Sequence, residues 1–365
     1  MFQTNMLAYE KRHKDQDGTP LVISFLITNR CILKCKHCFF HQTTKRTNVK
    51  DEDEMTIDEY LTLSKSMEPF EVALLCGGEP YMRDDLHEIV RILHTNNKIA
   101  SAGTSTNGQL TNNIIEQASL ICSQNRDMLF GLNFSLDGFE EIHDYIRGKG
   151  TFARSMHTWK ECKELAKQYD NLRLGIAFTF NTINQDEAPE FIKWSIKELQ
   201  PSSFGILKIR QSPRGGNELK DISLERYNSA TKALTECIKE GKLNPQNYIA
   251  SLFCQYVYNT MASGKRSFFC HAGKHGALIN YNGDINVCEI FPDERCSDQP
   301  LKMGNLRDYN MDFLKLWNSD DALKIKQLVG KHPACKMCTH ETEGLLPSVF
   351  FEPNISDLSK IDISK

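Results

Sequence analysis

Three cysteines near the amino end of the chain have the types and spacing that can hold a metal cluster. Cys31, Cys35 and Cys38 form a C-x3-C-x2-C run just after the apolar stretch 21–27. Three thiolates this close can ligate three irons of a [4Fe–4S] cluster. No fourth cysteine follows nearby, so the fourth iron would be open to another ligand and would be a site for chemistry. Zinc sites more often combine C-x2-C pairs, so the spacing favours iron–sulfur, with zinc as the alternative.

A second set of cysteines lies in the last third of the chain. Cys270 and Cys288 flank the dipeptide Asn282-Gly283, which is typical of a two-residue hairpin turn, and Cys335 and Cys338 form a C-x2-C pair. A hairpin with one cysteine on each strand, together with a distant C-x2-C pair, can surround a metal with four thiolates. By geometry alone this set also suits a structural zinc.

Apolar runs alternate with helical patterns through the first 215 residues. The runs lie at 21–27, 71–76, 99–106, 129–136, 172–180 and 204–210. They predict near-continuously buried strands, as in a parallel sheet. Thr56-Ile57-Asp58-Glu59 is a capping box that predicts the start of the first helix. Six strand–helix units in sequence predict an α/β fold, a (β/α)6 partial barrel whose hand is fixed by right-handed crossovers.

Four short motifs follow the first cysteine run, and the first three fall at the ends of predicted strands. They are Cys76-Gly77-Gly78-Glu79-Pro80, Ser105-Thr106-Asn107-Gly108, Ser135-Leu136-Asp137-Gly138 and Ile146-Arg147-Gly148. Their order and the cysteine spacing resemble the radical S-adenosylmethionine (SAM) superfamily over roughly residues 20–215. The resemblance implies that SAM chelates the open iron of the [4Fe–4S] cluster, and that reduction then yields a 5′-deoxyadenosyl radical.

The same resemblance implies which residues bind SAM. Gly77-Gly78 would let the backbone approach the methionine part of SAM, and Glu79 would accept a hydrogen bond from its amino group. Ser135 would contact the SAM ribose or carboxylate, and Arg147 would pair with the carboxylate. Asn107 is a further candidate, although Asn-Gly is first of all a turn signal.

Next to such a barrel, the second cysteine set resembles the twitch domain, the half-length relative of SPASM. The resemblance implies that Cys270, Cys288, Cys335 and Cys338 ligate one auxiliary [4Fe–4S] cluster, since no cysteine follows Cys338. The predicted fold is therefore a radical SAM core with a smaller Cys-rich α+β domain. We expect an N-terminal extension at 1–19, the core at 20–215, a helical linker at 216–264, the auxiliary domain at 265–345 and a tail at 346–365.

Composition predicts the cellular compartment of the protein and excludes some classes of partner. The chain of 365 residues has 44 Lys and Arg against 47 Asp and Glu, which predicts no nucleic-acid or membrane partner. No apolar run reaches 18 residues, and the first residues lack the apolar segment of a signal peptide. Thirteen cysteines without a secretion signal indicate metal or redox chemistry in a reducing compartment, so we expect a cytoplasmic protein.

Four functions fit these features. The first is modification of a small polar metabolite or sugar, with oxidation favoured over epimerisation. In the oxidation the auxiliary cluster accepts an electron, and a protein such as flavodoxin or ferredoxin is the electron donor. The second is cross-linking or epimerisation of a ribosomally made peptide. A maturase that activates a partner enzyme is a third option, and an iron–sulfur electron carrier or redox sensor without catalysis is a fourth.

The catalytic residue stays open. An epimerase must return a hydrogen atom to the substrate radical, and a cysteine thiol is the usual donor in related radical enzymes. The candidates are Cys254, Cys296 and Cys76, in that order, because the predicted helix of Cys254 leads directly into the auxiliary domain. A dehydrogenase would need none of them.

Overall fold

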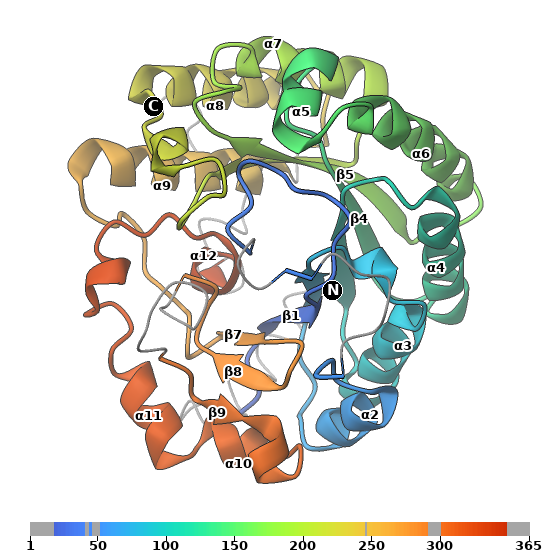
Figure 1. The fold of residues 1–365 in the computed structure, drawn as a ribbon, viewed down its shortest axis with the longest axis vertical. Helices are drawn as coiled ribbons and strands as arrows, with labels where there is room; N and C mark the ends of the chain where they lie inside the picture. The colour runs from blue at the N-terminus through green and yellow to red at the C-terminus, as the bar shows by residue number, and fades with distance from the viewer. Residues whose placement is uncertain (1–17, 41–43, 46–51, 245–246, 291–300, 349–365) are drawn as a thin grey trace.

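The computed structural model describes residues 18–40, 44–45, 52–244, 247–290 and 301–348. Its strands are β1 (Val22–Thr28), β2 (Val72–Gly77), β3 (Ser101–Thr106), β4 (Leu129–Ser135), β5 (Leu172–Phe180), β6 (Ser203–Lys208), β7 (Gly276–Ile279), β8 (Asp284–Asn286) and β9 (Gly304–Asn305). The first six are parallel and adjacent in chain order, as the sequence predicts. Figure 1 shows them inside an incomplete ring of helices, which confirms the partial barrel.

The helices that follow these strands are α2 (Ile57–Lys65), α3 (Leu86–Asn97), α4 (Thr111–Gln124), α5 (Glu140–Arg147), α6 (Thr151–Ala166) and α7 (Ala188–Trp194). Two more helices, α8 (Leu224–Lys239) and α9 (Tyr248–Ser263), come after β6 without an intervening strand. The last third contains α10 (Phe313–Trp317), α11 (Asp320–Lys326) and α12 (Thr342–Leu345). The predicted capping box forms at α2, where the Thr56 side chain accepts from the Glu59 backbone and Glu59 accepts from the Thr56 backbone.

One prediction about the sheet is wrong. Among the six barrel strands only β1 is buried along its whole length, whereas β4 and β6 alternate between buried and more exposed positions. The outer face carries large apolar side chains that pack in the core under the helices, among them Phe130, Phe134, Ile176, Phe178 and Ile206. The inner face carries small and polar residues, among them Ser105, Gly131, Asn133, Ser135, Gly175, Ala177, Thr179 and Gly205. The strands alternate because the barrel interior is not filled by apolar packing.

The C-terminal third extends the same sheet. β7 pairs in parallel with β1, with Val22 opposite Gly276 and Phe25 opposite Ile279. β8 and β9 continue antiparallel, so the full order is β6-β5-β4-β3-β2-β1-β7-β8-β9. The predicted hairpin turn connects β7 to β8, with Gly283 at a φ of 86°. In Figure 1 this hairpin and α10 to α12 lie where the helical ring is open.

Candidate functional site

The three cysteines of the first run lie together beyond the carboxyl end of β1. Cys35 is buried, Cys31 and Cys38 are half-buried, and the Cys38 N–H donates to the Cys35 carbonyl at 3.2 Å. Burial raises the pKa of the Cys35 thiol to about 12, and the two other thiols act in the same direction while Arg147 opposes them. The three thiols are therefore close enough to serve one cluster, which would bind the deprotonated form.

Gly77 and Gly78 bring the end of β2 against the segment that leads to Cys31. A Cβ on Gly78 would lie 2.1 Å from the Arg30 carbonyl oxygen, and one on Gly77 would lie 2.2 Å from that of Thr28. Gly77 also has a φ of 138°, which L side chains rarely adopt. Close backbone packing thus requires both glycines here, whatever their role toward SAM.

Glu79 is a buried carboxylate at the centre of the motifs. It accepts from Thr106 Oγ1 and from the Asn107 N–H, both at 2.8 Å. Burial raises the pKa of Glu79 to about 7, although these hydrogen bonds oppose the shift. No ion pair joins Glu79 to a Lys or Arg among the described residues, although the charge of Arg147 acts to lower its pKa. Its charge is therefore available to a donor that arrives with a ligand.

Arg147 reaches the cysteine run. Its Nε donates to Asp137 Oδ2 at 2.6 Å, and its Nη1 lies 3.9 Å from the Cys35 sulfur in hydrogen-bond geometry. Burial acts to raise the pKa of Asp137, but Arg147 together with His37, His143 and the hydrogen bond from the Thr179 backbone outweighs it and holds that pKa below its usual value. The guanidinium thus faces a thiol in addition to the carboxylate of Asp137, and its predicted pairing with SAM stays a prediction.

Asn107 and Ser135 lie on the same side of the barrel. The Asn107 carbonyl Oδ1 accepts from the Gln109 N–H, which is the predicted turn, and its Nδ2 lies 3.9 Å from the Cys31 sulfur. Ser135 ends β4 on the inner face, and its side chain is half-buried. The structure therefore brings Asn107 to both Glu79 and the cysteine run.

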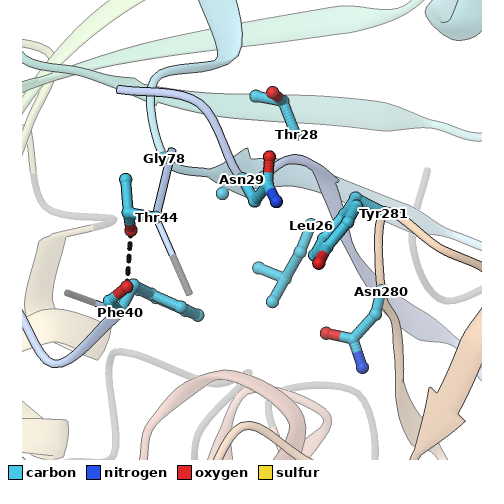
Figure 2. A pocket seen from close by; sticks show the side chains of 9 residues that line it. Leu26, Thr28, Asn29, Phe40, Thr44, Gly78, Asn280 and Tyr281 are labelled. Atoms are coloured by element: carbon cyan, nitrogen blue, oxygen red, sulfur yellow. Dashed lines mark hydrogen bonds between the residues drawn. The ribbon is translucent and has the colours of Figure 1, made fainter. Parts of the chain in front are cut away.

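A pocket opens beside the glycine loop. Figure 2 shows it between the carboxyl ends of β1 and β2 and the β7–β8 turn, and its lining residues are Leu26, Thr28, Asn29, Phe40, Thr44, Gly77, Gly78, Asn280 and Tyr281. Thr44 donates to the Phe40 carbonyl at 2.5 Å across one side of it. The pocket places the glycine loop next to the C-terminal hairpin, so both parts of the chain border this region.

The structure ranks the cysteine candidates differently from the sequence. Cys76 lies on the inner face at the end of β2, beside Ser105, Glu289 and Glu343, and burial raises the pKa of its thiol to about 12. Cys254 lies in the core layer between α8, α9 and β6, with its thiol against Tyr227. Cys296 lies outside the described residues. Of the two described candidates, Cys76 is the one that faces the barrel interior.

The second cysteine set surrounds a single cavity. Its wall includes Cys270, Cys288, Cys335 and Cys338. Nowhere in the described part of the chain do three His, Cys, Asp or Glu side chains converge tightly enough for a single metal ion. The four candidate ligands therefore line one cavity, and their assignment to an auxiliary cluster stays a prediction.

Sequence reasoning missed a buried charged cluster where the barrel meets the C-terminal third. Arg210, just past β6, contacts His340, Glu341 Oε2 at 3.3 Å and Glu289 Oε2 at 3.6 Å. His340 also pairs with Glu343. Burial acts to lower the pKa of Arg210, but the carboxylates outweigh it and raise that pKa. His340 and Glu341 directly follow the C-x2-C pair, and that position was the available signal.

Comparisons with known proteins agree with this geometry. The Radical SAM superfamily matches residues 25–195, and the SPASM iron-sulfur cluster-binding domain matches residues 270–339. Fe-coproporphyrin III synthase of Methanosarcina barkeri is 29% identical over 65% of this chain and 55% of its own length. The subtilosin biosynthesis protein AlbA of Bacillus subtilis is 22% identical over 84% of this chain and 62% of its own length. The chain thus spans only about half to two thirds of these relatives.

Among solved structures, SuiB of Streptococcus suis bound to S-adenosylmethionine has the same fold. The TM-score is 0.62 at 17% identity, and the match covers 92% of this chain and 76% of SuiB. In the described residues, no helix is long and apolar enough to cross a membrane. Superfamily members use SAM with a [4Fe–4S] cluster, and the SPASM domain adds auxiliary iron–sulfur clusters. The chain belongs to the radical SAM superfamily and carries a C-terminal SPASM-type iron–sulfur domain.

Proposed function

We propose that this protein oxidises a small polar substrate by radical SAM chemistry, with the auxiliary cluster taking up one electron. The observation that carries the proposal is the polar inner face of the barrel, which leads from the first cysteine run to the charged cluster beside the second. Cys76 on β2 and Arg210 beyond β6 border this interior, and Arg210 contacts His340, two residues after Cys338. A substrate held there would lie between the two cluster sites.

In this proposal the residues of the chain have distinct tasks. Cys31, Cys35 and Cys38 hold the SAM cluster, which supplies reductive cleavage of SAM when it is bound. Glu79 orients the amino group of SAM, and Ser135 offers a hydroxyl from the inner face. A basic side chain would accept the proton as a carbinol becomes a carbonyl.

The test is product analysis under anaerobic reduction with SAM and a panel of aminocyclitols and sugars. We expect 5′-deoxyadenosine and a product two mass units lighter than its substrate. Cys288→Ala should stop product formation, while Cys76→Ala and Cys254→Ala should not. If deuterium from the solvent is incorporated at a substrate carbon, and this incorporation is lost in Cys76→Ala, the reaction is an epimerisation and not an oxidation.

A second candidate is modification of a ribosomally made peptide. It is favoured by the similarity to AlbA, whose name assigns it to biosynthesis of a bacteriocin. Co-expression with a precursor peptide encoded beside the gene would test it. A peptide product lighter by two mass units, together with no turnover of the small-molecule panel, would establish this candidate over the first.

A further inference from the structure

The outer wall of the auxiliary cavity is built from two stretches of chain that lie side by side. These are residues 262–275 and 322–340, named here the basic face. The Arg266 N–H donates to the Lys336 carbonyl at 2.7 Å, and Gly273 packs against Val329 and Lys326. Arg266 itself lines the cavity together with Cys270 and Cys338. Whatever touches this face therefore comes close to the second cysteine set.

The basic face has an unusual charge. It carries Lys265, Arg266, Lys274, Lys324, Lys326, Lys331 and Lys336 and no Asp or Glu, although Asp320, Asp321 and Glu341 border it and Lys324 pairs with Asp321 at 2.8 Å. The whole chain, in contrast, has a net charge of −3. Lys265, Lys331 and Lys336 are exposed, and none of these three forms an ion pair with a described residue. A concentration of one sign of charge on an otherwise balanced protein attracts a partner of the opposite sign.

Two exposed apolar side chains lie within this charged surface. Phe269 is 64% exposed and precedes Cys270, while Met337 is 56% exposed and stands between Cys335 and Cys338. No other large apolar side chain among the described residues is more exposed than Phe269. Exposed apolar residues that stand beside basic ones are a composition suited to a specific but reversible protein contact.

We propose that the basic face docks a small acidic one-electron carrier that removes the electron from the auxiliary cluster. This rests on the proposed function, in which substrate oxidation leaves that electron behind. The step balances when the reduced auxiliary cluster passes one electron to oxidised flavin mononucleotide in a flavodoxin, and the flavin takes one proton from water to become a neutral semiquinone. The position over the cysteine cavity favours a redox carrier over nucleic acid or an anionic membrane.

Binding is tested first, with full-length reconstituted protein and oxidised flavodoxin. Lys265→Glu/Lys331→Glu reverses two exposed charges away from the cysteine ligands. It should weaken the Kd measured by calorimetry at low salt about ten-fold or more, and added salt should weaken the wild-type Kd. Lys160→Glu/Lys232→Glu makes the same charge change on exposed positions of α6 and α8. This control should bind like the wild type, and iron content should be equal in all three proteins.

Electron transfer is tested next in the Cys31→Ala/Cys35→Ala/Cys38→Ala background, which leaves only the auxiliary site to be reduced. After removal of excess dithionite, semiquinone formation should be slowed by the Lys265→Glu/Lys331→Glu change and not by the control. Equal rates in the two variants would overturn the proposal. It would also be overturned if the wild type bound duplex DNA or anionic vesicles but not flavodoxin, and the Lys265→Glu/Lys331→Glu change removed that affinity. If the substrate is oxidised but Lys265→Glu/Lys331→Glu leaves flavodoxin binding unchanged, only the docking face is refuted. If flavodoxin docks specifically but no oxidised product forms, only the proposed function is refuted.

Discussion

At the scale of single residues, Glu79 is the side chain on which SAM binding should depend most. Its carboxylate is buried and held by Thr106 and the Asn107 backbone, without a described cationic partner. An amino group that arrives with SAM would gain a charge-assisted hydrogen bond. Glu79→Gln should therefore weaken SAM binding by about 1.5–3 kcal/mol, roughly ten- to a hundred-fold, in anaerobic equilibrium dialysis.

Iron content distinguishes this effect from unfolding. Glu116→Gln removes a charge from an exposed position of α4 and is the matched control. Both variants should retain wild-type iron and sulfide. If Glu79→Gln bound SAM as tightly as Glu116→Gln, the assignment of Glu79 would be wrong.

The same residue predicts a pH dependence of stability. Burial raises the pKa of Glu79 from 4.5 to about 7. A raised carboxyl pKa means that ionisation costs folding free energy as pH rises from about 4.5 to 7, up to about 3 kcal/mol in all. Glutamine does not ionise and can still pair with Thr106 and Asn107. Without SAM, Glu79→Gln should raise the thermal unfolding midpoint at pH 8 and change it little at pH 5; an equal change at both values would contradict the argument.

At the scale of elements, the end of β2 positions the first cysteine run. Gly78→Ala would force a Cβ to 2.1 Å from the Arg30 carbonyl oxygen, which is backbone and has little freedom to move. The segment leading to Cys31 must shift, so the variant should lose the SAM cluster and retain the auxiliary one, about four irons of about eight.

Gly205→Ala is the matched control on β6. Its Cβ would meet nothing nearer than the Ile176 carbonyl oxygen at 3.9 Å. Iron measured by mass spectrometry should be unchanged in this variant. Equal loss of iron in both variants would mean that any added methyl group in the sheet disturbs the protein, and that the tight packing at Gly78 has no special role.

At the scale of the whole molecule, the two cysteine sets should be filled independently. They lie on different parts of the sheet, one beyond β1 and one beside β7 and β8, and they share no ligand. We expect about eight irons and eight sulfides per chain after anaerobic reconstitution. Cys31→Ala/Cys35→Ala/Cys38→Ala should leave about four, and Cys270→Ala/Cys288→Ala should leave the other four. Zinc recovered in place of the second set would disprove the auxiliary cluster.

Features that depend on neighbours in the chain can be predicted from the sequence alone. The six barrel strands are visible as apolar runs, the start of α2 as the Thr56 capping box, and the β7–β8 turn as Asn282-Gly283. The spacing of Cys31, Cys35 and Cys38 indicated the first cluster set because these ligands form one short run, whereas the second set was assembled through the resemblance to the twitch domain. These signals are local, so hydrogen bonding and side-chain period within a few residues are enough to fix them.

Features that depend on segments far apart in the chain could be learned only from the three-dimensional fold. β7 pairs with β1 across some 250 residues, and Arg210 meets His340 across 130. The fold also brings Glu289 and Glu343 beside Cys76, whereas Cys254 on α9 is buried against Tyr227. A single sequence does not show which strand edge pairs with which hairpin. That pairing depends on how much apolar surface it buries and on how many backbone hydrogen bonds it forms.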